Sequence, residues 1–225
     1  MFKRKLKQSE YFLIAANLLP VFGTWLWGWD AIEIFTVYCL ETILVGFYTL
    51  VKMGIVTAVR KQDDWYNQGT KRRVSGLFFM FFFIMHYGIF LAVQMGIFFS
   101  VSGVGDYYRI NFGNFFFKWP ELLSTDSMWL LASFFVGYGF ATIKDFIITR
   151  QYHTIPMMIL MFQPYIRIFI QQVVVILGSL FLTFGLGKVF ITIFALVKIM
   201  FEVYVDYDAI LRKASIDMKK ETGDS

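Results

Sequence analysis

The sequence predicts an all-α fold, a polytopic bundle of six transmembrane helices with short interfacial helices. Composition is the first reason: 58% of the 225 residues are hydrophobic and 16% are charged, whereas soluble domains carry about 25% charged residues. Second, six apolar stretches are each long enough to cross a bilayer as a helix, which takes about 20 residues. Third, lysine and arginine are distributed very unequally between the two sets of connections.

Residues 1–210 are expected to form one transmembrane domain, and residues 211–225 a polar cytoplasmic tail. The six spans are expected at approximately Tyr11 to Gly28, Ala31 to Val59, Gly76 to Val101, Met128 to Ile148, Tyr165 to Leu186 and Val189 to Ile210. The first span follows a basic segment, MFKRKLKQ, as in a signal peptide, but no small-residue cleavage site ends it. Interfacial tryptophans in GTWLWGWD end it instead, so we expect an uncleaved span.

The charged residues near the span ends predict the orientation. Sixteen of the 21 Lys and Arg residues fall on the side of the two termini, whereas Arg109, Lys118 and Lys188 fall on the other side. Positive residues mark cytoplasmic loops, so both termini are expected in the cytoplasm and the protein in the cell's inner membrane. The net charge of +5 is therefore attributed to membrane orientation, and no nucleic-acid partner is expected.

Three connections carry local predictions. The inner loop RKQDDWYNQGTKRRVS is polar and has no catalytic pattern. The outer segment from Ser102 to Ser127 is expected to form an interfacial helix or a cap over the bundle. In HTIPMMILMFQP, Thr154 can cap a helix that starts at Pro156. That helix is too short to span, and we expect it to lie along the inner surface or to re-enter before Pro164, after which the fifth span begins.

Polar residues inside the predicted spans are the candidates for function. A charge at mid-membrane costs about 2.5–3.5 kcal/mol, so it persists where it is paired or faces a wet cavity. Counting about 1.5 Å of helix rise per residue places Glu41, His86 and Lys198 near the midplane. Lys52 follows Glu41 by eleven residues on nearly the same helix face. We therefore expect an intramembrane polar cluster made of Glu41, Lys52, His86, Gln94, Arg167, Gln172, Lys198 and Glu202.

The same residues also have structural interpretations. The charged members can form interhelical ion pairs that fix the register of the helices, with Lys52 extending toward the inner headgroups. His86 beside Tyr87 fits a buried hydrogen-bonding group better than a metal ligand. Its ability to titrate near neutral pH still makes it a candidate for carrying protons.

Several short motifs carry a family resemblance. They are Trp29-Asp30 with Glu33, LETILVGFYTLVKM, HYGIF, PYIRI and Lys198. In this order they resemble a family of small bacterial polytopic membrane proteins that is catalogued as a domain of unknown function. The family pattern has a histidine eight residues after that of HYG and another five residues after the arginine of PYxR. This chain has Gln94 and Gln172 there, so the resemblance implies that any metal-binding or proton-carrying role of those histidines is lost or altered.

Other chemistries lack the residues that they need. Cys39 is the single cysteine, so neither a disulfide framework nor a Cys-rich metal site is expected. His153 falls in an inner loop, which excludes a bis-histidine haem with His86. No HExxH, GxSxG, P-loop or CxxC motif occurs. We expect no cofactor and no metal, and we favour a protein that is not an enzyme.

Three functions remain open at this point. The first is a transporter or channel-like protein whose polar cluster lines a cavity open to the cytoplasm and moves protons or a small polar solute. The second is a non-catalytic scaffold whose cluster locks the bundle and whose surface binds a partner or lipid. The third is an intramembrane enzyme that acts on a lipid or quinone, with Glu41 and His86 as acid and base. The first ranks highest because it needs least beyond the residues present, and a dry, fully paired cluster would favour the second.

Overall fold

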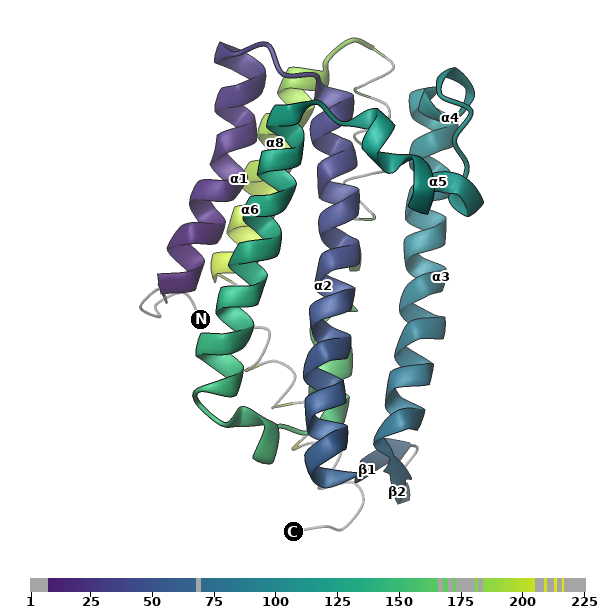
Figure 1. Ribbon diagram of the computed structural model, residues 1–225, viewed down its shortest axis with the longest axis vertical. Helices are drawn as coiled ribbons and strands as arrows, with labels where there is room; N and C mark the ends of the chain where they lie inside the picture. The colour runs from purple at the N-terminus through teal and green to yellow at the C-terminus, as the bar shows by residue number, and fades with distance from the viewer. Residues whose placement is uncertain are drawn as a thin grey trace.

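A computed structural model describes residues 8–67, 70–165, 168–169, 172, 181, 184–204, 209, 213 and 216. Figure 1 shows upright helices packed side by side, with a small hairpin at the lower end. Three helices of the described part are long and apolar enough to cross a membrane, Ala31–Arg60, Gly76–Val101 and Thr125–Ile147. They agree closely with the second, third and fourth predicted spans.

The described elements follow one another with short connections. In chain order they are α1 (Gln8–Leu26), α2 (Ala31–Arg60), β1 (Gln62–Asn67), β2 (Thr70–Ser75), α3 (Gly76–Ser102), α4 (Val104–Tyr107), α5 (Phe112–Lys118), the 3-10 helix η1 (Trp119–Leu122), α6 (Thr125–Ala141), the π-helix η2 (Thr142–Ile147), the 3-10 helix η3 (Gln151–His153) and α8 (Gly187–Tyr204). Residues 157–165 are also helical. The segment from Ser102 to Ser127 contains the short helices α4, α5 and η1, and α4 and α5 lie beside the upper part of α3 (Figure 1).

The all-α prediction is wrong at the loop between α2 and α3. There β1 and β2 pair antiparallel, from Gln62 opposite Ser75 to Asn67 opposite Thr70. Aromatic side chains anchor both faces of this hairpin. The half-buried Trp65 ring lies 5.5 Å from the Phe79 ring of α3, and Tyr66 on the other face is 8% exposed. The packing of these two rings stabilises the strands, a signal that a mostly polar sequence hides.

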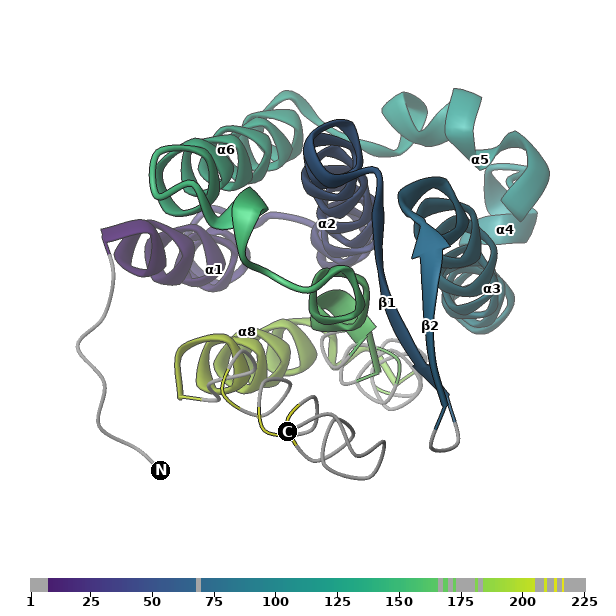
Figure 2. The same cartoon turned by 90° about the horizontal axis from the view of Figure 1, so that it is seen from below.

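α2 is the central helix of the bundle. Figure 2 shows α1, α6 and α8 around one side of it and α3 on the other. Every residue from Ile34 to Thr42 is buried, as expected for a helix that is covered on all faces. The Phe35 ring lies 4.4 Å from the Phe98 ring of α3 and 5.4 Å from the Phe190 ring of α8. This single side chain therefore joins both sides of the bundle.

Polar contacts hold the bundle at its two ends. At the upper end in Figure 1, Trp25 Nε1 donates to Thr192 Oγ1 at 2.9 Å, which ties α1 to α8. At the hairpin end, an Arg60 guanidinium nitrogen lies 2.9 Å from Asp63 Oδ2 and donates to the Ile155 carbonyl oxygen. The two loops predicted on the inner side therefore meet at the same end of the bundle.

The helix after η3 begins within one residue of its predicted start at Pro156 but is capped differently and continues past Pro164. The Met157 N–H donates to Asp63 Oδ2 at 2.8 Å, so a carboxylate of β1, and not Thr154, satisfies a free N–H of its first turn. Thr154 Oγ1 instead donates to the Gln151 carbonyl oxygen at 3.4 Å. Residues 157–165 are helical without a break, so the predicted separation of a short helix from a span starting at Tyr165 is wrong.

Candidate functional site

Glu41 of α2 and Lys198 of α8 meet in the bundle interior. The Lys198 ammonium donates a hydrogen bond to Glu41 Oε2, and the Tyr138 hydroxyl of α6 donates to Oε1 at 2.5 Å. Glu41 is 1% exposed and Lys198 is 6% exposed. Because each carboxylate oxygen accepts from a different helix, this neutral ion pair links α2, α6 and α8.

Aromatic rings cover the ammonium group of this pair. Lys198 Nζ lies 4.5 Å from the centre of the Tyr38 ring and 4.8 Å from the centre of the Phe134 ring. Rings at these distances attract a cation through their negative faces. We call Glu41, Lys198, Tyr138, Tyr38 and Phe134 the paired cluster, since its carboxylate and its ammonium are both engaged.

Close packing at Gly139 brings α6 near enough to α2 for Tyr138 to reach Glu41. A Cβ atom at Gly139 would lie 3.0 Å from the Tyr48 hydroxyl oxygen, and that hydroxyl donates to the Phe135 carbonyl oxygen at 3.0 Å. Sequence reasoning missed Tyr138 because it considered only charged, histidine and amide side chains. The signal was present in GYG, a polar tip between two glycines near the middle of an apolar stretch.

Caps at the upper end fix the registers of α2 and α6. The Asp30 carboxylate accepts from the Ile32 N–H at 2.6 Å at the start of α2. Glu33 Oε2 accepts from the Ser124 hydroxyl at 2.6 Å and from the Ser127 hydroxyl at 2.8 Å at the start of α6. These contacts set the depth at which Glu41 and Tyr138 can meet.

His86 lies on α3 and has no hydrogen bond or ion pair with the paired cluster. It packs among aromatic rings, with ring-centre distances of 5.5 Å to Phe82, 5.3 Å to Phe90 and 5.1 Å to Tyr165. His86 Nδ1 is buried and has no hydrogen-bond partner in the described part of the chain. The structure therefore separates His86 from Glu41, although the two share a predicted depth.

Other buried polar groups near His86 also lack partners. Gln94 of α3 is 0% exposed, and its side chain makes a weak hydrogen-bonding contact with the Cys39 thiol. Apart from this sulfur contact, neither amide heteroatom has a hydrogen-bond partner among the described residues. The Tyr165 hydroxyl oxygen and Gln172 Oε1 are also buried and have no hydrogen-bond partner among the described residues. We call His86, Gln94, Tyr165 and Gln172 the unpaired polar face.

Ring contacts bring two members of this face together. The Tyr165 ring lies 5.1 Å from the His86 ring and 5.9 Å from the Tyr87 ring of α3. Gln94 follows His86 by eight positions on α3, farther from the hairpin end. Tyr165 therefore faces α3 at the level of His86.

Tyr87 differs from its neighbour His86 because its hydroxyl group is hydrogen-bonded within the protein. The Tyr87 hydroxyl donates to the Thr42 carbonyl oxygen of α2 at 2.8 Å. Gly46 makes this approach possible, since a Cβ atom there would lie 2.7 Å from the Tyr87 ring. This contact fixes α3 against α2 and leaves His86 on the side that Tyr165 covers.

The remaining predicted site residues lie elsewhere. Lys52 Nζ lies 5.9 Å from the centre of the Phe146 ring of η2. Arg167 and the side chain of Glu202 lie outside the described residues. The described members of the predicted cluster thus divide into the paired cluster, the unpaired polar face and Lys52.

Comparison with known proteins identifies a family. Residues 1–222 match the family described as "Family of unknown function (DUF6498)". No curated protein and no solved structure matches the chain. The match covers nearly the whole sequence, which confirms the resemblance to an uncharacterised family. The chain therefore belongs to the DUF6498 family of unknown function.

Proposed function

We propose that this protein is a six-span membrane protein that moves protons or a small polar solute along the unpaired polar face. In this proposal the paired cluster holds the surrounding helices in place. The protein lies in the cell's inner membrane with both termini in the cytoplasm, and its immediate partners are the lipid bilayer and the transported species. No catalytic residue and no bound cofactor is part of the proposal.

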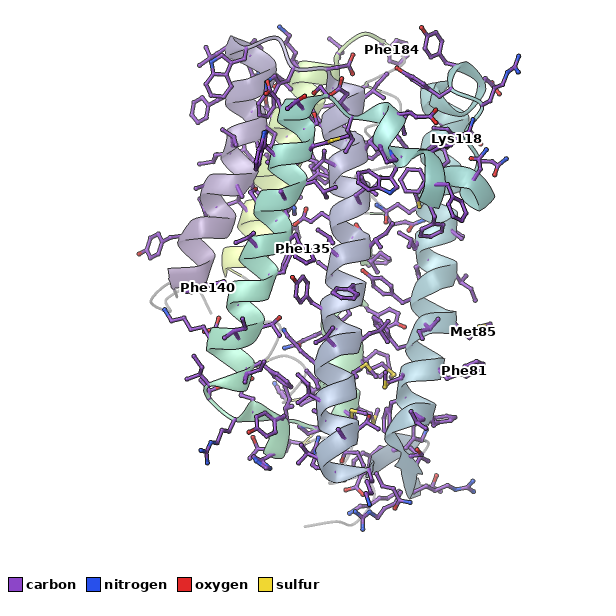
Figure 3. The ribbon with its side chains drawn as sticks, in the orientation of Figure 1. Phe81, Met85, Lys118, Phe135, Phe140 and Phe184 are labelled. Atoms are coloured by element: carbon purple, nitrogen blue, oxygen red, sulfur yellow. The ribbon has the colours of Figure 1, made fainter. Side chains whose placement is uncertain are left out.

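The arrangement of the helices supports six crossings. α1 and α8 lie alongside the three long apolar helices and contact each other (Figure 1). Ile155 lies at the hairpin end, where its carbonyl accepts from Arg60, and Phe184 lies at the opposite end (Figure 3). The proposal accounts for these two positions by a further passage between them. Together with α8, that passage would give an even number of crossings, as the distribution of positive charge predicts.

The observation that carries the transport proposal is the set of buried polar atoms without partners. Leaving a buried donor or acceptor unsatisfied costs about 1–3 kcal/mol. Buried polar groups are hydrogen-bonded in the great majority of cases, so the exceptions point to a bound molecule or to ordered water. The unpaired polar face offers donors and acceptors on two facing helices, the chemistry that a polar solute or a chain of water needs.

The paired cluster supports the scaffold as a second candidate function. Glu41 and Lys198 are closed off from solvent and paired with each other, which is the arrangement expected of a structural lock. We therefore move the transport pathway from Glu41 to the α3 side of α2. An enzyme that uses Glu41 and His86 together on one substrate gains no support, since the two side chains do not contact each other.

Flux through reconstituted vesicles tests the transport proposal. The purified protein is placed in liposomes that contain a pH-sensitive dye, and proton flux is followed after an imposed pH gradient, with and without small neutral polar solutes. We expect flux in the wild type and its loss in Gln94→Leu, because leucine removes both amide groups from the pathway. Gln62→Leu is the matched control, since Gln62 is an exposed residue of β1, and it should retain wild-type flux.

Two outcomes would remove support from transport. Equal flux in the wild type and in Gln94→Leu would mean that the unpaired polar face is not the pathway. Absence of proton and solute flux in folded wild-type protein would leave the scaffold as the better candidate.

A further inference from the structure

The three consecutive cations of β2 differ in their surroundings. Lys71, Arg72 and Arg73 are all exposed. Lys71 Nζ lies 3.5 Å from Asp64 Oδ2, and Arg73 is the cross-strand partner of Asp64. Arg72 is the cross-strand partner of Trp65. Because cross-strand partners project to the same face of a hairpin, Arg72 shares a face with Trp65, while Lys71 and Arg73 share the other face with Asp64.

The face that carries Arg72 is turned toward the start of α3. The Trp65 ring lies 5.4 Å from the Phe78 ring and 5.5 Å from the Phe82 ring. α3 is a candidate membrane span that begins at Gly76, so the hairpin lies at the level where that span leaves the membrane. Tryptophan and arginine side chains at this level commonly contact the headgroup region of a bilayer.

An exposed apolar surface continues from this point along α3. Leu77 is 66% exposed, Phe81 66% and Met85 54%, and their spacing of four residues keeps them on one side of the helix. Figure 3 shows Phe81 and Met85 pointing away from the bundle. This stripe is suited to a lipid acyl chain, and its lower limit at Leu77 lies next to the hairpin that carries Trp65 and Arg72.

We propose that Arg72 binds the phosphate of an anionic phospholipid whose acyl chain lies along Leu77, Phe81 and Met85. Within the described residues no carboxylate forms an ion pair with Arg72. A guanidinium group binds phosphate through two parallel hydrogen bonds, and its positive charge favours a lipid with net negative charge over a zwitterionic one, whose headgroup cation it repels. The apolar stripe distinguishes a lipid from free phosphate as the ligand. The proposal requires α3 to be inserted in a membrane but is independent of transport.

Lipid binding to the purified full-length protein tests this site. Native mass spectrometry of the detergent-solubilised protein measures the affinity for phosphatidylglycerol and for phosphatidylcholine. We expect Arg72→Gln to weaken phosphatidylglycerol binding about fivefold. Arg73→Gln removes the same charge from the opposite face, and we expect it to change the affinity less than about twofold, because that side chain faces Asp64. Phosphatidylcholine binding should be unaffected by either change.

Three results would overturn the site. The first is an equal loss of phosphatidylglycerol affinity in the two variants, which would mean diffuse attraction to the whole hairpin. The second is an unchanged affinity in Arg72→Gln. The third is complete displacement of phosphatidylglycerol by inorganic phosphate. Melting temperature in detergent checks that each variant is folded. If a glutamine variant does not fold, the pair Arg72→Lys and Arg73→Lys replaces it, because lysine keeps the charge and loses the two-bond geometry. The larger loss is again expected at Arg72, and the opposite order would contradict the proposal.

Discussion

The two groups of buried polar side chains differ in how their polar atoms are satisfied. In the paired cluster, which joins α2 to α6 and α8, the Glu41 carboxylate accepts from Lys198 and Tyr138. In the unpaired polar face on the α3 side, His86 Nδ1 is buried without a partner in the described residues, and the Gln94 amide has only the weak contact with the Cys39 thiol. One group is closed and neutral, and the other retains free hydrogen-bonding capacity.

The difference suggests opposite consequences for stability and for function. Removing one member of a satisfied pair leaves a buried charge behind, which is costly. Replacing an unsatisfied polar group with an apolar group of similar shape removes a desolvation cost, so it is neutral or stabilising. A side chain that is retained despite such a cost is a candidate for binding a ligand or passing a solute. Mutations in the two groups should therefore have opposite effects.

The largest effect on stability is expected at Glu41. Glu41→Gln leaves the Lys198 ammonium buried without its counter-charge, and we expect a loss of about 3–5 kcal/mol in the free energy of unfolding. Denaturant unfolding in detergent measures this. The double variant Glu41→Gln with Lys198→Met is the control, and it should recover much of the loss because no buried charge remains. A single variant as stable as the wild type would contradict the structural role of the pair.

A smaller effect is expected from the hydroxyl of Tyr138. Tyr138→Phe removes the donor to Glu41 Oε1, and a hydrogen bond to a charged group contributes about 1.5–3 kcal/mol. Tyr48→Phe is the matched control on α2, since its hydroxyl donates to the neutral Phe135 carbonyl oxygen. That change should cost about 0.5–1.5 kcal/mol. Equal losses from the two substitutions, measured by the same unfolding experiment, would show that Tyr138 does not act through the charge of Glu41.

The smallest effect on stability, and of opposite sign, is expected at Gln94. Gln94→Leu removes a fully buried amide whose hydrogen-bonding contact in the described structure is the weakly polar Cys39 thiol, so we expect the free energy of unfolding to stay unchanged or to rise by about 1 kcal/mol. Thermal melting in detergent measures the change. A clear drop in melting temperature would mean that the amide is bonded within the protein, and the contrast with the paired cluster would then fail.

Much of the fold could be predicted because apolar length and flanking charge mark helices directly. α2, α3 and α6 with η2 have their predicted positions for this reason. The hairpin was missed because its strands are mostly polar and depend on tertiary packing: Trp65 packs against the start of α3, and Tyr66 lies beside Met158, which is distant in the sequence. The continuous helix through Pro164 was missed because proline usually marks the end of a helix.

The sequence could predict how deep the candidate site residues lie along their spans, but not which of them meet. Counting residues from the ends of the spans placed Glu41, His86 and Lys198 at one level, and the structure brings two of these three together. Depth carries no information on how helices are arranged around α2, so the separation of His86 from Glu41 could not be derived. Tyr138 lay at a suitable depth but has no formal charge, and only its contact with Glu41 reveals its role.

An experimental density map fine enough to locate ordered water tests the contrast between the two groups most directly. We expect non-protein density within hydrogen-bonding distance of the Gln94 amide and His86 Nδ1, and direct contact between Glu41 and Lys198 with no water between them. A map in which protein atoms satisfy the Gln94 amide, or in which water separates Glu41 from Lys198, would contradict the distinction drawn between the two groups.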